Sequence, residues 1–484
     1  MLKLCKISLG SALFLSSCSM MPTYHQPGLP ILNDYPDLHE KGENKETLIS
    51  QKVVTIGWRD FFSDSYLYQL IEMSLHHNRD LRKAILAIEE ARLQYDIQSN
   101  EQLPTIKASA TYNAARTSVD LTQPGYPTLT RQQSLGIGLT DFEIDFFGRI
   151  QSLKEVALND YLATEEAQRS VQISLISEVA SAYFLECRYA EQEEIKNQLI
   201  AAQEEQLKMI KNRFTAGNAS LNDVRQQESL LESTLSEAAK LKLLHAQAIN
   251  SLTLLVGKEL PSKKHNASLS LQKMMLNISA GLPSELLLNR PDILAAERNL
   301  QAANANIGAA RAAFFPTISL TSTFGTASNQ LSHLFRPGRN TWNFAPSLTM
   351  PIFDWGTNID NLDLATIRKE MSIVDYEKSI QSAFREVSDA LAARTSLEQQ
   401  LRAQARYVKA IAARENLMKQ RYHQGINNLS DLLEIQQDLF NAHASLIDIQ
   451  YSRLSNGAML YKALGGGSLE KTIEENKLLE SASS

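Results

Sequence analysis

The sequence predicts an α+β fold made of two similar halves, each with two β-strands and a pair of very long helices. A motif with an arginine, an aromatic residue, a glycine, a leucine and an aspartate occurs in register at residues 213–224 and 421–432. Proline-free helical stretches precede both copies, and segments that alternate apolar with polar residues precede those stretches. Two in-register copies of one motif, each preceded by the same kinds of segment, indicate a chain built by duplication.

The first residues predict an export signal at residues 1–17. Lys3 and Lys6 precede an apolar run that is too short to span a bilayer. The run ends in Leu-Ser-Ser-Cys, which resembles a bacterial lipobox, so Cys18 is expected to carry a diacylglyceryl group and become the N-terminus. The alternative is an ordinary signal peptide. Ser19 stands where an aspartate would signal retention in the inner membrane, so we expect sorting to the outer membrane.

Composition excludes several classes of function. The net charge of −6, without a Lys/Arg-rich patch, argues against nucleic acid as a partner. No G-x-S-x-G, H-E-x-x-H, P-loop or C-x-x-C pattern is present, so we expect no enzyme, no metal site and no cofactor beyond the lipid. The adjacent His76 and His77 are expected at the surface. Cys187 is expected to be a buried thiol outside any disulfide.

The first half is predicted to follow a lipidated, extended arm at residues 18–63. This first half covers residues 64–257. It is predicted to contain a helix from about Asp64 to Asn100, a β-hairpin over 104–145 and a helical hairpin over 148–257. Apolar residues recur at every second position of the two strands: Ile106, Ala108, Ala110, Tyr112, Leu135, Ile137 and Leu139. These strands are therefore expected to have one apolar and one small or polar face.

The second half repeats this order after a linker at residues 258–281. It covers residues 282–467, and residues 468–484 are expected to be a flexible tail. Its parts are a helix, a β-hairpin over 316–353 and a helical hairpin over 356–465. Alternating apolar positions are Ile318, Leu320, Phe324, Trp342, Phe344, Leu348 and Met350. Pro346 lies on the apolar side, which argues against uninterrupted pairing there.

Four strands cannot close a membrane barrel, because even the smallest such barrels have about eight. An open sheet edge in a bilayer is prohibited energetically. Oligomerisation resolves this, and three chains would supply twelve strands and a hollow cylinder of helices. The predicted class is therefore an α+β membrane protein, each chain forming one third of a trimeric 12-stranded outer-membrane β-barrel and of a periplasmic α-barrel. The alternative is a soluble β-sandwich packed on helices.

The duplicated motif predicts the tips of two helical hairpins. Gly217 and Gly425 are each suited to end a helix with a positive φ. An aspartate follows six residues after each glycine, as Asp223 and Asp431. Helix capping is the simpler role for these two acids. Capping does not account for Glu434, which lies one turn into the following helix.

Several segments resemble the lipoprotein outer-membrane factors of the TolC superfamily, in the OprM/NodT-like branch. They are GLPSELL at 281–287, NRPDI at 289–293, AANANIGAARAAFFP at 302–316 and LYKALGGG at 460–467. The resemblance implies a trimeric conduit that docks with a periplasmic adaptor and an inner-membrane pump, commonly of the resistance-nodulation-division class. Such a conduit exports drugs or other toxic compounds across the outer membrane. Alternatives are the conduit of a type I protein secretion system and, in a different class, a structural envelope lipoprotein with helical stalks.

The same resemblance implies that the hairpin tips close the periplasmic entrance. Asp431 and Glu434 match acids that ring the constriction, and Asp223 matches the acid of the first half. Tyr422 matches an aromatic residue that helps hold the tip shut. Asn427 replaces a basic residue of the family, so that closing salt link is expected to be absent or moved. Three copies of an acid around a three-fold axis would raise some of the carboxyl pKa values and attract cations.

The lipobox predicts covalent acylation that depends on one side chain. Replacing Cys18→Ala should abolish incorporation of radiolabelled palmitate into the mature protein, because the thiol that would carry the diacylglyceryl group is gone. Labelling that stays undiminished in the variant would refute the assignment.

Overall fold

The computed structural model describes residues 19–28, 30–31, 53–123, 125–262, 268–272, 274–275, 278 and 289–472. They divide into two compact units. The first unit comprises Met1–Gly28, Ala87–Glu165 and Ala295–Tyr376, and the second comprises Leu29–Leu86, Glu166–Leu294 and Glu377–Ser484. The predicted acylation site Cys18 and the predicted helix start at Leu282 lie outside the described residues.

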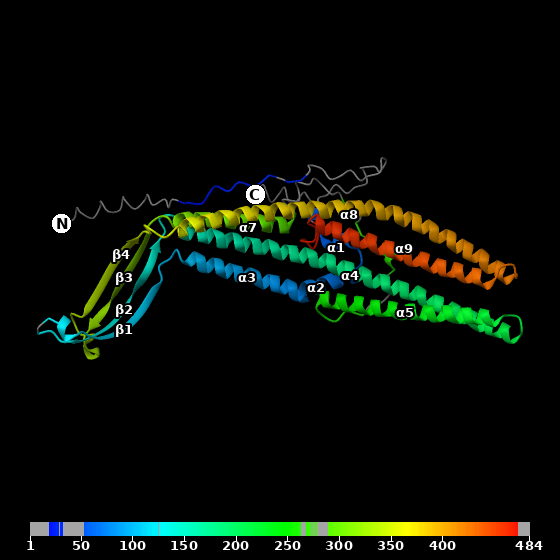
Figure 1. The fold of residues 1–484 in the computed structure, drawn as a ribbon, viewed down its shortest axis with the longest axis horizontal. Helices are drawn as coiled ribbons and strands as arrows, with labels where there is room; N and C mark the ends of the chain where they lie inside the picture. The colour runs from blue at the N-terminus through cyan, green and yellow to red at the C-terminus, as the bar shows by residue number, and fades with distance from the viewer. Residues whose placement is uncertain are drawn as a thin grey trace. The chain divides into compact units, whose positions relative to one another are not determined.

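A four-stranded antiparallel sheet belongs to the first unit, with its strands in the order β1-β2-β3-β4 (Figure 1). The strands are β1 (Ile106–Arg116), β2 (Leu129–Ile144), β3 (Thr317–Ser328) and β4 (Asn340–Thr349). Each half of the chain contributes one hairpin, and the pairing of β2 with β3 joins the two halves. β1 and β4 are consequently the edges of the sheet.

The register confirms the alternation predicted for both hairpins. Ala108 lies opposite Ile137, which lies opposite Phe324, which in turn lies opposite Trp342. Directly opposed residues point to the same side of a sheet, so these four form one apolar row. The large apolar residues of this face are exposed, namely Ile106, Tyr112, Leu135, Ile137, Phe324, Trp342, Phe344 and Leu348. The described part of the chain therefore leaves one apolar face of the sheet uncovered.

Pro346 does not interrupt the sheet, contrary to the prediction. It lies opposite Leu320 within a continuous β3–β4 register. Because β4 is an edge strand, the N–H that proline lacks is not required by a further strand of the same chain.

Glycines and a bulge shape the middle of the β2–β3 pair. Gly136 lies opposite Gly325, and a Cβ on Gly325 would come within 2.1 Å of the carbonyl oxygen of Leu135. A bulge follows in β2, where Asp141 has a φ of 53°. Aspartate tolerates this left-handed conformation, and a bulge bends its strand and increases the local twist.

Helices make up most of the remaining described chain. The α-helices are α1 (Trp58–Phe61), α2 (Ser65–His77), α3 (Arg79–Asn100), α4 (Arg149–Thr215), α5 (Leu221–Val256), α7 (Pro291–Ala312), α8 (Thr357–His423) and α9 (Leu429–Ala463). α4 and α8 have 67 residues each, or about 100 Å at 1.5 Å per residue. Within the described ranges, no helix combines the length and apolar character that crossing a membrane requires.

The N-terminal arm of the first unit lies along α7. The side-chain amide of Asn304 donates to the carbonyl oxygen of Pro22 at 2.8 Å. The hydroxyl of Tyr24 donates to Glu297 at 3.2 Å. Hydrogen bonds at Pro22 and Tyr24 thus hold the arm, residues 19–28, against the helix.

The single helix predicted from Asp64 to Asn100 is wrong, because the chain breaks it at Asn78. This residue has a ψ of 133° and ends α2. Its side-chain oxygen accepts from the backbone N–H groups of Asp80 and Leu81, both at 2.9 Å, and so caps α3. The break was not predicted because apolar residues recur at helical spacing on both sides of Asn78, and the cap is a single polar residue within that pattern.

Part of the predicted extended arm instead forms core structure in the second unit. Trp58, Phe61 and Phe62 are each at most 2% exposed. The ring of Phe61 stacks on that of Tyr461, with centroids 4.0 Å apart. An aromatic cluster of this kind has no periodicity along the chain, so the sequence pattern did not distinguish it from a loop.

The beginning of the predicted flexible tail lies beside α1. The backbone N–H of Trp58 donates to the carbonyl oxygen of Leu469 at 3.0 Å, and that of Arg59 donates to Glu470 at 3.1 Å. The backbone N–H of Thr472 donates to the carboxylate of Asp60 at 2.8 Å. The chain is thus bound as far as Thr472, and the rest of the tail lies outside the described residues.

A buried arginine joins the start of α7 to α8 and α9 in the second unit. The side chain of Arg290 is 7% exposed and donates to both oxygens of Asp292, at 3.0 and 2.6 Å. It also donates to the carbonyl oxygen of Ala463 at 3.0 Å and lies 2.9 Å from a carboxylate oxygen of Glu386. A buried charge is stable only when it is paired in this way.

Replacing Arg290→Met should destabilise the second unit, because three acceptors lose their donor. Loss of one partner of a buried pair costs about 3–5 kcal/mol. Asp292 and Glu386 are 38% and 41% exposed, so we expect roughly 2–3 kcal/mol in the free energy of unfolding. Arg402→Met is the control, because Arg402 is 66% exposed in its ion pair. An equal loss in both variants, measured by denaturant unfolding, would contradict this prediction.

Candidate functional site

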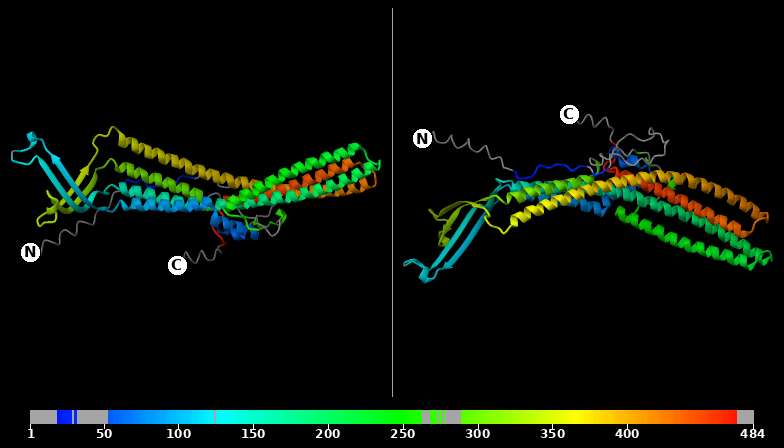
Figure 2. Two further views of the ribbon diagram at one scale, coloured as in Figure 1. Left: turned by 90° about the horizontal axis from the view of Figure 1, so that it is seen from below. Right: turned by 45° about the horizontal axis from the view of Figure 1, so that its top comes forward.

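The two predicted hairpin tips lie in the second unit, between α4 and α5 and between α8 and α9. Figure 2 shows both tips at the same end of that unit. In the first tip, Gly217 has a φ of 76°. Its N–H donates to the carbonyl oxygen of Phe214 at 2.9 Å, and the N–H of Asn218 donates to that of Arg213 at 2.8 Å. This pair of bonds is the Schellman arrangement, which requires a left-handed residue and therefore favours glycine.

The second tip has the same backbone arrangement. Gly425 has a φ of 73°, and its N–H donates to the carbonyl oxygen of Tyr422 at 3.0 Å. The N–H of Ile426 donates to the carbonyl oxygen of Arg421 at 2.9 Å. The sequence motif thus encodes one turn geometry twice.

Asp223 acts as a helix cap at the start of α5. Its carboxylate accepts from the backbone N–H of Ser220 at 3.0 Å, and its own N–H donates to the Ser220 hydroxyl at 3.1 Å. These bonds form a capping box. The backbone N–H of Ser220, then its hydroxyl, lowers the pKa of the Asp223 carboxyl. The capping role that the sequence predicts for Asp223 is therefore correct for its local contacts.

Asp431 occupies the same position in α9 but has different partners. Asn428 caps this helix by accepting from the backbone N–H of Asp431 at 2.9 Å. The carboxylate of Asp431 accepts from the side-chain amide of Asn427 at 3.0 Å. Asn427 in turn accepts from the guanidinium of Arg421 at 2.6 Å. Asn427 thus connects a cation to an acid within one tip.

Glu434 lies one turn beyond Asp431 on α9, and its side chain is exposed. Among the described residues it has no hydrogen bond or ion pair within the chain. Asp431 and Glu434 are three residues apart on α9, whereas Asp223 lies on α5 of the other hairpin.

Three side-chain hydrogen bonds connect the two helical hairpins near their tips. Arg213 donates to the hydroxyl of Tyr422 at 3.0 Å. The other two bonds, each at 3.0 Å, join Gln206 to Gln436 and Gln226 to Ser430. All three are polar and two are exposed, so each contributes little to stability.

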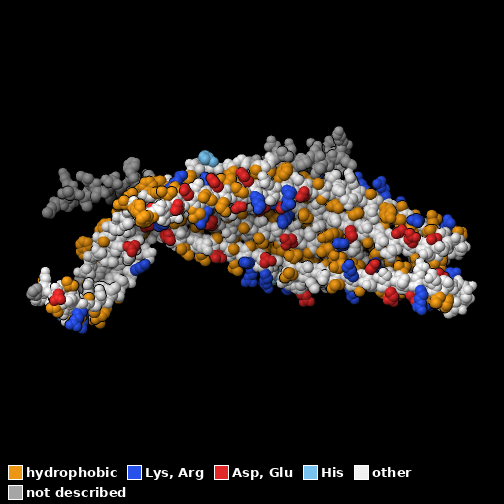
Figure 3. Space-filling model, viewed as in Figure 1, with side chains coloured by type: hydrophobic (Ala, Val, Ile, Leu, Met, Phe, Trp, Pro, Cys, Tyr) orange, Lys and Arg blue, Asp and Glu red, His pale blue; other side chains and the backbone are white. Residues whose placement is uncertain are grey.

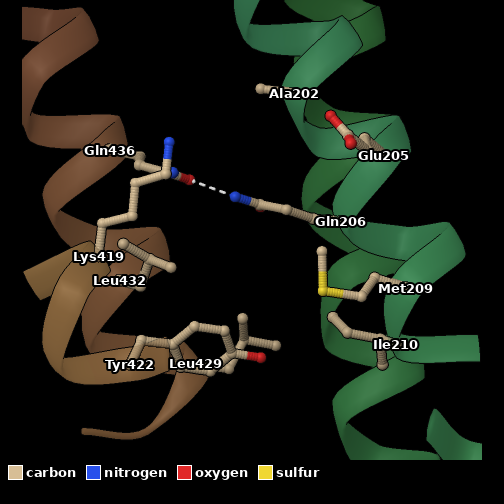
Figure 4. A pocket seen from close by; sticks show the side chains of 10 residues that line it. All are labelled: Ala202, Glu205, Gln206, Met209, Ile210, Lys419, Tyr422, Leu429, Leu432 and Gln436. Carbon is tan, nitrogen blue, oxygen red and sulfur yellow. Dashed lines mark hydrogen bonds between the residues drawn. The ribbon is translucent and has the colours of Figure 1, made fainter. Parts of the chain in front are cut away.

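A cavity of about 290 Å³ separates α4 from α8 and α9 next to these bonds. Figure 4 shows the Gln206–Gln436 bond across it and Tyr422 near its lower end. Its apolar lining consists of Ala202, Met209, Ile210, Tyr422, Leu429 and Leu432. Tyr422 also packs on a small core of Ile411, Leu432 and Ile435. The first hairpin is therefore incompletely packed against the second at this level.

The sequence did not reveal the partners of the predicted tip residues. Arg213 and Arg421 both belong to the repeated motif, so the recurrence of arginine was a usable signal. From the sequence alone Asn427 is only a substitution of a basic residue, although it bridges two charged residues of its own tip.

Another polar cluster lies further along α4. His245 of α5 lies 2.8 Å from Glu193 and 3.3 Å from Glu186. Cys187 is 1% exposed, as expected for a buried thiol, and its Sγ lies 3.6 Å from Glu186. Within the part of the chain that is described, no group of three or more His, Cys, Asp and Glu residues is arranged to hold a metal ion.

Comparisons with known proteins match this chain to one family and to relatives that are named as efflux proteins. Residues 70–258 and 282–466 each match the family described as outer membrane efflux protein. The solvent efflux pump outer membrane protein SrpC of Pseudomonas putida is 42% identical over 94% of this chain and 96% of its own. The cation efflux system protein CusC of Escherichia coli K12 is 40% identical over 94% of this chain and 98% of its own.

A solved structure resembles the fold over nearly the whole chain. The open state of the outer membrane channel MtrE of Neisseria gonorrhoeae superposes with a TM-score of 0.85 at 37% identity. The match covers 94% of this chain and 100% of that one.

The bond between Arg213 and Tyr422 generates a prediction about local stability. Tyr422→Phe keeps the ring in place but removes the hydroxyl, so the two tips lose one connection. An exposed hydrogen bond to a charged group contributes about 0.5–1 kcal/mol. Backbone amides of residues 421–432 should therefore exchange with deuterium roughly 2–5-fold faster.

Tyr407→Phe provides the matched control, because Tyr407 lies on the same helix and is 49% exposed. This control should leave exchange at the tip unchanged. Exchange in Tyr422→Phe that equals the wild-type rate would show that the bond does not hold the tips together.

Proposed function

The chain belongs to the outer membrane efflux protein family, and on that premise we propose that three copies form a conduit for drugs or other small toxic compounds. Family membership makes it an outer-membrane channel of an efflux system that extends into the periplasm. The family resemblance noted from the sequence, to the TolC superfamily, is confirmed. The trimer, the route of the substrate and the gate are proposals.

The observation that carries the trimer is the four-stranded sheet with an exposed apolar face. β1 and β4 have no strand on their outer sides among the described residues. In lipid, unpaired backbone groups cost several kcal/mol each, so the edges need strands from other copies. Three sheets of four strands would close a barrel of twelve, with the apolar face toward lipid and the Ser/Thr/Asn/Gly face toward water.

Two further features support an origin by duplication. The family matches the chain twice, over residues 70–258 and 282–466. The element order α3, β1, β2, α4, α5 recurs as α7, β3, β4, α8, α9. Two equal contributions per chain would give a sixfold quasi-symmetric wall in the trimer.

The proposed lipid on Cys18 would be continuous with the arm bound to α7. The arm begins at Ser19 in the described residues and is held through Pro22 and Tyr24. A lipid attached one residue before it would therefore be fixed close to the first unit.

The partners proposed are a periplasmic adaptor and an inner-membrane pump, of the resistance-nodulation-division class. The relatives are named for solvent and cation efflux. These names favour small compounds over the polypeptide cargo of a secretion system.

The gate is proposed to consist of Asp431 and Glu434, with Tyr422 holding the tip and Asp223 supporting the first hairpin. In this proposal the bridge from Arg421 through Asn427 to Asp431 takes the place of the family's closing salt link. Because Asp223 is engaged as a cap, the acids that face a three-fold axis are assigned to the second tip.

Purified protein in planar bilayers tests the conduit and the gate together. The wild type should conduct ions, with a preference for cations. The double variant Asp431→Asn with Glu434→Gln should lose this preference or show higher single-channel conductance, because six carboxylates leave the trimer entrance.

Asp363→Asn with Glu370→Gln is the matched control, since it makes the same charge change on the exposed surface of α8. Absence of conductance in the wild type would refute the conduit. Unchanged conductance and selectivity in the tip variant would remove only the gate assignment.

A further inference from the structure

Two arginines interrupt the apolar face of the sheet at the end far from the helices. Ala114 lies opposite Arg131, and Arg116 lies two residues further along β1. The β1–β2 register is continuous from Ile106 to Arg116, so both arginines point to the same side as Tyr112. Both are exposed.

Their height on the sheet corresponds to a membrane surface. From Ile106 to Arg116 the strand advances by about 34 Å, which at a tilt of roughly 40° spans about 26 Å across a membrane. The apolar band of outer-membrane barrels is about 25 Å tall. With Ile106 at the periplasmic boundary, next to the helices, Arg116 and Arg131 reach the opposite boundary, which faces the outside of the cell.

The outer end of the sheet has an excess of positive charge. The strand ends and connections there, residues 114–131 and 327–340, contain four arginines, Arg116, Arg131, Arg336 and Arg339, and one acid, Asp120. The whole chain, by contrast, has a net charge of −6. Lys and Arg side chains are visible at this end of the strands in Figure 3.

Arg116 and Arg131 have no acidic partner in the described part of the chain. As diagonal neighbours on one face, their Cα atoms are separated by roughly 7–8 Å. Side chains as long as arginine can converge from Cα atoms at this separation, and two like charges at the edge of a low-dielectric region repel each other unless an anion lies between them.

We propose that Arg116 and Arg131 form a binding site for the phosphate groups of the glycolipid in the outer leaflet. This inference rests on the proposed function, because it places the apolar face of the sheet in lipid. The guanidinium group binds phosphate with two parallel hydrogen bonds. Tyr112 lies on the same face of β1, two residues before Ala114, where its ring would contact the start of the acyl chains. Phosphate bound at this site would hold the sheet at a fixed depth in the membrane.

Native mass spectrometry of the detergent-purified trimer tests the site, with diphosphoryl lipid A as the titrant. Arg116→Gln with Arg131→Gln should weaken binding roughly tenfold to thirtyfold, since each arginine near an anionic surface contributes several-fold. Lys107→Gln is the matched control, because Lys107 lies on the same strand but on the opposite face. Arg116→Lys with Arg131→Lys, which keeps the charge but not the forked geometry, should show an intermediate loss.

The outcomes distinguish a specific phosphate site from general attraction of anionic lipid. Selective weakening in the glutamine double variant, with Lys107→Gln unchanged, supports the site. Equal weakening in both, unchanged binding in the double variant, or equal affinity for phosphatidylglycerol would overturn it. Conductance of the same trimer in bilayers is recorded in parallel. A trimer that conducts but fails the lipid test refutes this inference alone, whereas a chain that forms no conducting trimer refutes the proposed function.

Discussion

The pairing of backbone groups along the edges of the sheet is the constraint on which the rest of this structure depends. β1 and β4 present edges of 11 and 10 residues, and the sheet between them exposes its apolar face. In water such a face favours aggregation, and in lipid the bare edges are prohibitively costly. In the trimer proposed above, strands of other copies would pair these edges, and the apolar face would lie against lipid. The glycines and the bulge in the β2–β3 pair would favour this closure, because a sheet that closes into a barrel must bend and twist.

In the helical part, ion pairs and hydrogen bonds between side chains contribute to the contacts between helices. α4 is joined to α9 by Arg188 and Asp448 at 2.6 Å, and to α5 by Lys196 and Glu237 at 2.8 Å. Toward the tips, the side-chain hydrogen bonds between the hairpins are those of Gln206, Arg213 and Gln226, and they lie next to a cavity. The packing between the two hairpins is therefore incomplete beside this cavity, whereas the rings around Tyr461 are in direct contact. Elements that move in a functional transition are drawn from regions of low local stability.

Periodicity predicted the strands, their apolar face and the long helices, because each of these has a repeat of fixed spacing along the chain. The glycine tips were also predictable, since one sequence motif encodes one backbone geometry. What the pattern could not predict rests on single residues or on contacts between distant segments. Asn78 breaks a helix through one side chain, and Trp58 finds its partners near Leu469. For the tips, the positions were predicted but the partners Arg213 and Asn427 were not, since they depend on how two hairpins pack and on the rotamer of one amide.

The two tips show how two copies of one sequence motif can differ in their chemistry. Asp223 and Asp431 occupy the same position after the same kind of turn. A serine precedes α5, and its backbone N–H is satisfied by Asp223, which engages that carboxylate locally. An asparagine precedes α9 and caps it through its own side chain, and the carboxylate of Asp431 accepts from a side-chain amide instead. A carboxylate bound to a side chain can exchange that partner when the tip moves, whereas one bound to the backbone must first unwind the helix start. The carboxylate of the second tip is therefore the one that can change its hydrogen-bond partner without unwinding a helix start, which is the property that the proposed gate requires.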